Sequence, residues 1–404
     1  MSKTPKLRFK EFSGDWESKK LHQVSDVLSG KRVPKGMNLV EYNTGIPYIT
    51  VSDMGDKYVA LNKLKYITPK IEECIKKYKV LANDIIISVA GTLGKINLIQ
   101  SELENANLTE NCDKITNLKN ANYKYLYYYL NTEHIQNQIS SVNTISSQPK
   151  LALACIRDFN IAIPDLKEQE KIASFFSLID DKISLQDEKL KMLKDYKKGM
   201  MQKIFSRELR FKDDEGRDYP EWEVTTIENI ANLEKGFTPD TKNEKNWIGD
   251  IPWLSIADMK QGKYISDVSK HISCEALGNK KLVAKGTLIM SFKLTLGRLA
   301  IVNRDIMTNE AICHFYWKYK NINTEYMYYY LSTVNIESFG CRAAKGITLN
   351  NDSLNSIVVK IPSISEQNKI ANALIMLDGK IEKEQEKLDS LNEYKKGLLQ
   401  QMFV

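Results

Sequence analysis

The stretch IPDLKEQEKIASFFSLIDDKISLQDEKLKMLKDYKKGMMQKIF (residues 163–205) occurs twice in this chain, the second time as IPSISEQNKIANALIMLDGKIEKEQEKLDSLNEYKKGLLQQMF (residues 361–403). The two copies align without a gap at an offset of 198 residues, and they share the runs EQ, KIA and YKKG. Chance does not produce such a match within one chain. The sequence is therefore an internal duplication.

Each copy predicts one long helix with a narrow apolar seam. It opens with a proline and a capping-box pattern, Asp165 with Glu168 and Ser363 with Glu366. Seam residues then recur at alternating spacings of four and three, and they are mostly apolar. They are Ile172, Phe176, Ile179, Ile183, Gln186, Leu190, Leu193, Lys197, Met200 and Ile204, then Ile370, Leu374, Leu377, Ile381, Glu384, Leu388, Leu391, Lys395, Leu398 and Met402. This pattern indicates a coiled coil, and an amphipathic helix lying on a globular core is the alternative.

Helix length and chain order constrain the layout. A helix of about 36 residues is roughly 54 Å long, and the next globular segment starts within a few residues of the first helix. Two paired seams must then run antiparallel, because a parallel pair would need a long return loop. This predicts two globular domains held apart by an antiparallel coiled coil, with the C-terminus near the first domain. A polar seam residue can fix register, and Gln186 and Glu384 are assigned this role.

The duplication continues more loosely in the segments before each helix. GIPYITVSDM (45–54) returns as DIPWLSIADM (250–259), IIISVAGTLGKINLI (85–99) as LIMSFKLTLGRLAIV (288–302), and YLYYYL (125–130) as YMYYYL (326–331). Between these islands the halves differ almost completely. A shared scaffold with different loops is what two readers of different targets would need.

The globular segments predict an α+β fold class, with two pseudo-symmetric mixed domains. Strands are expected at Ile46–Val51, Ile85–Val89, Ile96–Ile99, Phe159–Ile163, Ile251–Ile256, Leu288–Phe292, Ala311–Trp317 and Ile357–Ile361. Helices are expected at Lys70–Lys79 and at the two tyrosine segments, whose rings should pack on the domain body rather than stack on bases. The strands do not alternate regularly with helices, so the sheets should be mixed or antiparallel. The domain boundaries are 1–163, 164–207, 208–361 and 362–404.

Composition and motifs exclude several classes of protein. The net charge is +7, and residues 1–163 carry most of the basic excess, which suits nucleic-acid contact but is weak support alone. No apolar run approaches a membrane span, and the first residues lack the apolar core of a signal peptide. The six cysteines and four histidines form no metal-ligand spacing. We therefore expect a reduced, cytoplasmic protein without a metal site.

No stretch carries a catalytic signature. Residues 91–95 (GTLGK) superficially resemble a phosphate-binding loop, but their spacing and context fail. Dinucleotide-binding, nucleophile-elbow and zinc-protease motifs do not occur, and neither does the tetrapeptide that amino-methyltransferases use. No catalytic residue is predicted.

The order of a variable globular unit followed by a KEQEKIA-type or SEQNKIA-type helix ending in YKKG, present twice, resembles the specificity subunit of a type I restriction–modification system. IPYITVSDM, IPWLSIADM and the TLGK and TLGR loops are further marks, and the resemblance covers the whole chain. It implies that each globular domain is a target-recognition domain that reads one half of a split DNA site, while the coiled coil sets the gap.

The same resemblance implies partners and cofactors. Two modification subunits would dock on this chain, bind S-adenosylmethionine and methylate adenine at N6. Two restriction subunits would add ATP-driven and Mg-dependent translocation and cleavage. This chain would bind none of these cofactors and would do no covalent chemistry. Two other classes remain open: a coiled-coil scaffold that joins two protein partners without DNA, and a modifying enzyme in its own right.

DNA contacts are expected in loops that correspond between the halves but differ in sequence. These are Ser29–Lys35, Thr92–Lys95 and Ser146–Lys150, then Lys235–Lys245, Lys293–Arg298 and Arg342–Asn350. The candidate DNA-binding residues are Lys31, Arg32, Lys95, Gln148, Lys150, Lys235, Thr238, Lys293, Arg298, Arg342 and Lys345. Lys197, Lys198, Lys395 and Lys396, near the helix ends, are expected to meet partner subunits or solvent.

Overall fold

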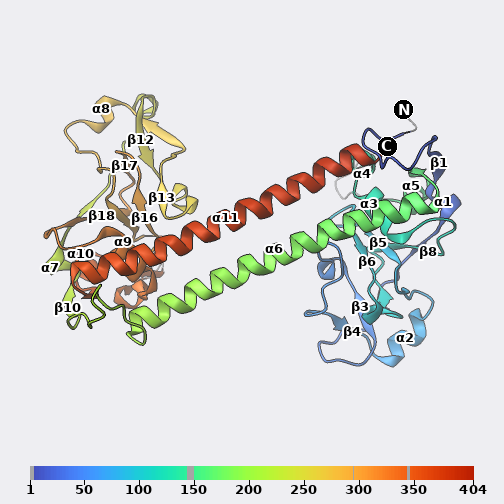
Figure 1. Ribbon diagram of the computed structural model, residues 1–404, viewed down its shortest axis with the longest axis horizontal. Helices are drawn as coiled ribbons and strands as arrows, with labels where there is room; N and C mark the ends of the chain where they lie inside the picture. The colour runs from blue at the N-terminus through green and yellow to red at the C-terminus, as the bar shows by residue number, and fades with distance from the viewer. Residues whose placement is uncertain (1–3, 143–149, 294, 344–345) are drawn as a thin grey trace. The chain divides into compact units, whose positions relative to one another are not determined.

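The chain folds into two compact units, which we describe from a computed structural model covering residues 4–142, 150–293, 295–343 and 346–404 (Figure 1). Unit 1 comprises residues 1–187 and 386–404, and unit 2 comprises residues 188–385. Each unit therefore combines a sheet domain with one stretch of each long helix. The sequence predicted a different division, into four consecutive segments, and that division stays a prediction.

Unit 1 is built on a sheet with the strand order β2–β8–β5–β6, and every neighbouring pair in it is antiparallel. These strands are β2 (Asp26–Ser29), β8 (Cys112–Thr116), β5 (Ile85–Ser88) and β6 (Ile96–Leu98). A smaller sheet has β3 (Pro47–Ile49) between antiparallel β4 (Lys65–Tyr66) and parallel β7 (Asn107–Leu108), and β1 (Glu17–Lys20) pairs with β9 (Asn160–Ile163). The helices are α1 (Leu21–Val24), α2 (Pro69–Ile75), α3 (Tyr123–Leu130), α4 (Glu133–Val142) and α5 (Leu153–Arg157).

Unit 2 repeats this plan with one strand added at an edge. Its main sheet has the order β11–β18–β15–β16–β13, with strands Ala231–Lys235, Ile312–Trp317, Leu288–Ser291, Leu299–Val302 and Tyr264–Ile265. A second sheet has the order β14 (Lys270–Ile272), β12 (Ile251–Leu254), β17 (Met307–Thr308), while β10 (Glu223–Thr226) pairs with β21 (Val358–Ile361) and β19 (Cys341–Ala343) with β20 (Gly346–Thr348). The helices are α7 (Ile227–Ile230), α8 (Cys274–Leu277), α9 (Thr324–Thr333) and α10 (Asn351–Asn355).

The strands predicted from the sequence are confirmed, and so is the mixed character of the sheets. Several strands were not predicted. Some of them, such as β4 and β13, are two residues long and therefore leave no period-two pattern, but others are longer, among them β1, β2, β8, β10, β11 and β14. The helix expected at Lys70–Lys79 ends earlier, at Ile75. The chain turns there, and the amide of Leu108 donates to the Tyr78 carbonyl at 3.0 Å.

The repeated EQ pair explains how each long helix begins. Helix α6 (Leu166–Ser206) opens with the Asp165 side chain accepting from the Glu168 amide at 2.9 Å, and the Glu168 carboxylate then binds Arg8 at 2.7 Å. Gln169 donates to the carbonyls of Asn120 and Pro164 and accepts from the Asn122 amide. The side chains of the EQ pair therefore tie the first turn to the segment that leads into α3.

Helix α11 (Ile364–Met402) begins in the same way in unit 2. Glu366 binds Arg210 at 3.0 Å, and Gln367 donates to the Asn321 and Pro362 carbonyls. These glutamate and glutamine side chains are fully buried, so their partners must satisfy them. The arginines stand in a further repeat, LRFK, at residues 7–10 and 209–212. The charge pairs thus account for the recurrence of both LRFK and EQ.

The end of each long helix packs on a tyrosine helix, and this confirms the antiparallel pairing within each unit. In unit 1, Phe403 lies 5.4 Å from Tyr125 and 5.7 Å from Tyr129 between ring centroids. In unit 2, Phe205 lies 5.5 Å from Tyr330. Each tyrosine helix therefore meets the start of one long helix and the end of the other. The tyrosines are buried in the cores, as expected from the sequence.

One expectation about the helix ends is wrong. Lys197 and Lys395 do not point to solvent, because Lys197 pairs with Asp378 in unit 2 and Lys395 pairs with Asp180 in unit 1. Lys198 and Lys396 are exposed. Among the helices of the described residues, none combines the length and the apolar character needed to cross a bilayer.

Candidate nucleic-acid interface

The first and second predicted loops lie at one end of the main sheet in each unit. In unit 1, β2 ends at Ser29 and β5 ends at Ser88, while β8 begins at Cys112 and β6 begins at Ile96. These four strand termini therefore lie together at one end of the sheet. Lys150 forms an isolated β-bridge with Ala90 beside this end of the sheet. In unit 2 the corresponding loops leave the matching ends of β11, β15, β18 and β16. The loops of each unit are therefore neighbours although they are distant in sequence.

A glycine sets the course of the first loop in both units. The Gly30 amide donates to the Cys112 carbonyl at 3.0 Å, and a Cβ atom on Gly30 would lie 2.0 Å from the Thr109 carbonyl oxygen. In unit 2, a Cβ on Gly236 would lie 2.2 Å from the Thr308 carbonyl oxygen. Only glycine fits such a close approach of two backbones.

The loops leave these glycines on matched paths. Tyr48 donates its hydroxyl hydrogen to the Lys31 carbonyl at 2.8 Å, and Trp253 donates its indole hydrogen to the Phe237 carbonyl at the same distance. An aromatic side chain of the smaller sheet thus holds the residue after each glycine.

The TLGK and TLGR segments are the same hairpin. In unit 1, the Gly94 amide donates to the Ser88 carbonyl at 2.9 Å, and the Lys95 amide donates to the Ser88 Oγ at 2.9 Å. In unit 2, Gly297 and Arg298 make the same two contacts with Ser291. Both glycines have positive φ, which explains the shared glycine. Lys95 and Arg298 therefore start from equivalent backbone positions.

The candidate residues differ in exposure. Lys31, Arg32, Lys150, Lys235 and Lys293 are exposed, whereas Lys95, Thr238 and Arg298 are half-buried. Gln148 and Lys345 lie outside the described residues, and for Arg342 the structure describes only its backbone, in β19.

Three candidate side chains are held by neighbours within the protein. Lys95 donates to the Met54 carbonyl, which turns its ammonium group towards the domain. Arg32 pairs with Glu110, although its side chain remains 77% exposed. Thr238 accepts a hydrogen bond from Asn309 at 3.0 Å. These residues shape the loops, and of the three Arg32 reaches furthest into solvent.

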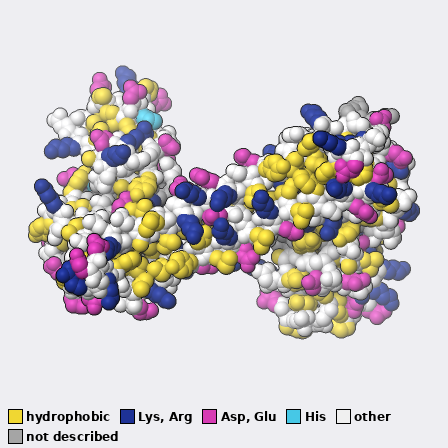
Figure 2. Space-filling view, viewed as in Figure 1, with side chains coloured by type: hydrophobic (Ala, Val, Ile, Leu, Met, Phe, Trp, Pro, Cys, Tyr) yellow, Lys and Arg dark blue, Asp and Glu magenta, His cyan; other side chains and the backbone are white. Residues whose placement is uncertain are grey.

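Unit 2 brings two predicted lysines together. The ammonium nitrogens of Lys235 and Lys293 lie 4.8 and 5.7 Å from the centre of the Phe292 ring. Two cations on one aromatic ring form a local positive site next to the end of β15. Elsewhere the charges are mixed, and Figure 2 shows Lys and Arg side chains interspersed with Asp and Glu on both units.

Acidic side chains lie among the loops of unit 1. They were not predicted from the sequence, because basic residues were sought there. Asp113 is 3% exposed, and its burial raises its pKa to about 6, although a hydrogen bond from Ser29 and the charges of Lys150 and Arg157 oppose this shift. Glu110 accepts from Arg32 and Thr109. The alternation of strand β8 could have placed Asp113 on a buried face.

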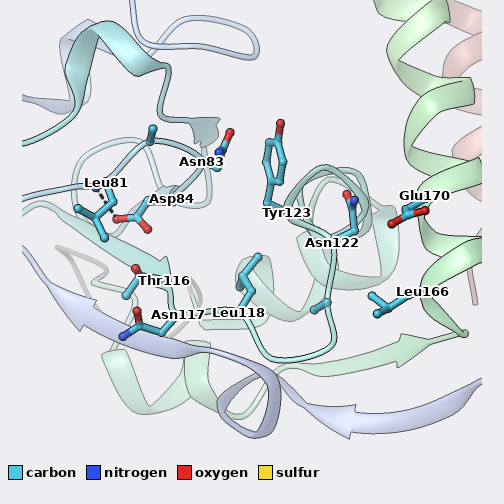
Figure 3. Close-up of a pocket in the computed structure, with 12 residues that line it drawn as sticks. Leu81, Asn83, Asp84, Thr116, Asn117, Leu118, Asn122, Tyr123, Leu166 and Glu170 are labelled. Atoms are coloured by element: carbon cyan, nitrogen blue, oxygen red, sulfur yellow. Dashed lines mark hydrogen bonds between the residues drawn. The ribbon is translucent and has the colours of Figure 1, made fainter.

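A cavity of about 440 Å³ opens at the opposite end of the same sheet (Figure 3). Asp84 and Thr116 lie on its wall, and the stretch from Asn122 to Tyr123 and the first turn of α6 close it. Burial raises the pKa of Asp84, against hydrogen bonds from Thr116 and the Leu81 amide and the charge of Lys114. The carboxylates of Asp84 and Glu170 make this cavity a poor site for phosphate.

The family model for the type I restriction modification DNA specificity domain matches residues 13–195 and again residues 219–393. The chain belongs to the type I restriction–modification specificity subunits. The two matches cover both sheet domains and most of both long helices, so the duplication read from the sequence is a duplication of this specificity domain.

One known specificity subunit matches nearly the whole chain, and another matches half of it. The putative type I restriction enzyme MjaX specificity subunit of Methanocaldococcus jannaschii is 24% identical over 98% of this chain and 94% of its own. The MjaIX specificity subunit of the same organism is 28% identical over 50% of this chain and 48% of its own.

Solved structures share the fold. The crystal structure of a type I restriction–modification S subunit from M. genitalium has a TM-score of 0.57 and 16% identity, with 99% of each chain covered. A chain from a structural study of the assembly and conformational transition of the type I system has a TM-score of 0.59 and 14% identity, with 95% of this chain and 96% of that chain covered. The role of this specificity subunit is DNA recognition.

Proposed function

We propose that each unit reads one half of a bipartite DNA site. The observation that carries this proposal is the common sheet end, where the same scaffold presents loops of different sequence in the two units. A shared scaffold gives both units the same approach to the duplex. The different loops allow two unrelated half-sites to be read.

The chemistry of the loops suits duplex DNA. Exposed lysines such as Lys31, Lys150 and Lys235 would contact phosphates, which makes binding salt-dependent. Arg32 carries a planar donor group that suits the O6 and N7 acceptors of guanine in the major groove. Its pairing with Glu110 would orient this group before DNA binds. Gln148, Arg342 and Lys345 belong to the third loop of each unit and would act in the same way.

The long helices would set the gap between the half-sites. Helix α6 has 41 residues and α11 has 39, and a continuous helix of 41 residues is about 60 Å long. One turn of B-DNA is about 34–36 Å. The length of the helix is therefore comparable to the length of duplex that a gap and two half-sites occupy. Helix length is therefore the variable that would decide gap length.

The catalytic steps would belong to partner subunits. Two modification subunits would dock on this chain and supply S-adenosylmethionine-dependent methylation of adenine at N6, and two restriction subunits would supply ATP- and Mg-dependent translocation and cleavage. Within the described residues, no three His, Cys, Asp or Glu side chains gather as a metal site would require. This chain would act as a reader and scaffold without covalent chemistry of its own.

The test is a methylome. The chain is expressed with and without its modification subunits in a host that lacks adenine methylation, and N6-methyladenine is mapped by single-molecule sequencing. We expect one bipartite motif that appears only when both are present. A soluble, assembled complex that leaves no new methylation would overturn the proposal and would favour a scaffold that joins protein partners.

A further inference from the structure

Each helix seam carries one lysine, and both lysines are half-buried in ion pairs. Lys197 of α6 and Lys395 of α11 stand at the same position of the duplicated helix. Their side chains are only 21% and 26% exposed. An apolar residue would fit such a seam position without the cost of removing an ammonium group from water. The repeated lysine therefore needs a reason beyond packing.

In unit 1, the partner of Lys395 is held from three directions. Asp180 of α6 is 12% exposed and accepts from Lys395 at 2.7 Å, from Lys57 at 2.6 Å and from the Tyr128 hydroxyl at 2.6 Å. Burial alone would raise the pKa of Asp180, but the hydrogen bonds from Lys395, Lys57 and Tyr128 lower it below its ordinary value. The charged carboxylate thus joins α6 to the sheet domain, through α3 and Lys57, and to α11.

Unit 2 builds a related junction with exchanged helices, in which the aspartate is 33% exposed and the sheet-domain lysine pairs with a glutamate instead of the aspartate. Asp378 of α11 accepts from Lys197 of α6 and from the Tyr329 hydroxyl. Lys263 donates to the Tyr329 oxygen at 2.8 Å and pairs with Glu325. Lys263 follows the second SDM-like motif as Lys57 follows the first. The two halves therefore retain the same lysine, tyrosine and aspartate although their loops have diverged.

We propose that these two junctions fix the axial position of the long helices, against each other and against the sheet domain of their own unit. Aromatic packing of the helix ends is non-directional and tolerates a small displacement along the helix axis. Hydrogen bonds to a carboxylate do not, because they weaken steeply when distance and angle change. The proposal rests on the proposed function in one step only, in which the axial position of the helices sets the length of the gap between the half-sites.

The length scale supports this role. A displacement of one residue along a helix is about 1.5 Å, and a displacement of one turn is about 5.4 Å. Either would take the Lys395 ammonium group out of hydrogen-bond range of Asp180, whose position Tyr128 and Lys57 hold. One base pair of DNA is about 3.4 Å. Axial position must therefore be held to within a few ångströms for a single gap length.

The sequence assigned register to two other seam residues, Gln186 and Glu384. Glu384 is buried and pairs with Lys189 at 3.0 Å, but the Lys189 side chain is 49% exposed. A long, exposed lysine can follow a displaced carboxylate at little cost. Gln186 is half-buried. The assignment of register to Gln186 and Glu384 stays a prediction.

The experiment compares three double variants of the full chain. K197M/K395M replaces both seam lysines by an apolar side chain of similar length, which should fold because the seam is otherwise mostly apolar. K197R/K395R keeps a donor to each aspartate. K198M/K396M is the matched control, because it changes the exposed neighbours of the seam lysines.

The first readout needs no DNA. Lys194 and Gln385 lie in contact at 3.4 Å within unit 2, so cysteines there, linked by a short bismaleimide, report the helix position. Cys74, Cys155, Cys274 and Cys341 are changed to serine beforehand, while the buried Cys112 and Cys313 stay. We expect the link to form about threefold more slowly in K197M/K395M, which corresponds to less than one ordinary hydrogen bond, and at the original rate in the other two variants.

The second readout is the methylome of the assembled complex. Complexes with the original chain, K197R/K395R or K198M/K396M should methylate sites of one gap length, and K197M/K395M should also methylate sites with the gap changed by one base pair. An unchanged cross-linking rate together with an unchanged gap in K197M/K395M overturns the inference. If no chain directs methylation, the proposed function fails instead, and the cross-linking rate still decides the role of the junctions.

Discussion

Arg8 and Glu168 are 160 residues apart in sequence, and their side chains form a two-point ion pair at 2.7 Å in which the Glu168 side chain is only 1% exposed. The pair joins the N-terminal segment of unit 1 to the first turn of α6. Arg210 and Glu366 repeat it in unit 2. Both halves thus begin their long helix with the same buried charge, which only an arginine from outside the helix neutralises.

The first prediction concerns this pair. Glu168→Gln removes the charge and leaves Arg8 without its carboxylate, so we expect unit 1 to lose about 3 kcal/mol of unfolding free energy. Urea unfolding followed by amide hydrogen exchange in unit 1 measures the loss. Glu170→Gln, in the same turn but exposed, is the control and should cost less than about 0.5 kcal/mol. Equal losses in the two variants would contradict a special role for the pair.

The second prediction concerns glycine. A methyl group on Gly30 would clash with the Thr109 carbonyl, so Gly30→Ala should destabilise unit 1 by about 2 kcal/mol and displace the first loop. Gly199→Ala is the matched change in a helix interior, where nothing lies within 4 Å of the new methyl group. It should raise stability by about 0.5–1 kcal/mol. Thermal unfolding of both variants gives the sign of each change in stability. A Gly30→Ala variant as stable as the original chain would refute the close approach of the two backbones.

The third prediction is a dependence on pH in unit 2. Burial lowers the pKa of His314 to about 4, and its ring nitrogen lies 2.7 Å from the Thr308 hydroxyl oxygen. The unfolded chain binds a proton near pH 6.5 and the folded chain does not, so the stability of unit 2 falls as pH drops from about 6.5 towards 4. The full loss for this group is about 3 kcal/mol.

Tryptophan fluorescence can follow this effect, because Trp222, Trp247, Trp253 and Trp317 lie in unit 2 and only Trp16 lies in unit 1. Urea midpoints between pH 7.5 and pH 5 should decline less steeply in His314→Gln than in the original chain. The same slope in both proteins would show that His314 is protonated when folded.

The fourth prediction tests the lysine pair beside Phe292. If Lys235 and Lys293 each contact a phosphate, the double change to glutamine should reduce the slope of log affinity against log salt concentration by about 1.8 for the assembled complex on duplex DNA. Lys320→Gln is the control, because Lys320 is exposed beyond the other end of strand β18. A slope that changes equally in the control, or not at all in the double variant, would remove these lysines from the interface.

Much of the fold was predictable because its signals are local. The heptad seam, the capping boxes and the β-branched runs report periodicity, and periodicity decides which face of a segment is buried. The duplication then doubled every signal. The short strands β4 and β13 escaped, since two residues carry no period and form only where a neighbouring strand accepts them.

The candidate site was less predictable. The sequence pointed to basic residues in variable loops, and the strand pairing shows that the first two of these loops share one end of the sheet in each unit. It could not show that Lys95 turns towards the Met54 carbonyl, or that Asp113 lies buried among the loops. Such contacts join residues that are far apart in the chain, and no local pattern encodes them.

The sequence by itself determined the duplicated architecture, the two long helices and the family resemblance, because repetition and apolar spacing can be read along one dimension. The tertiary structure decided the roles of the charged residues. Lys197 and Lys395 were expected to meet partner subunits or solvent, yet each lies half-buried against an aspartate that a tyrosine of the sheet domain holds in place. A charge becomes structural only when folding brings its counter-charge within hydrogen-bond distance and removes water from both.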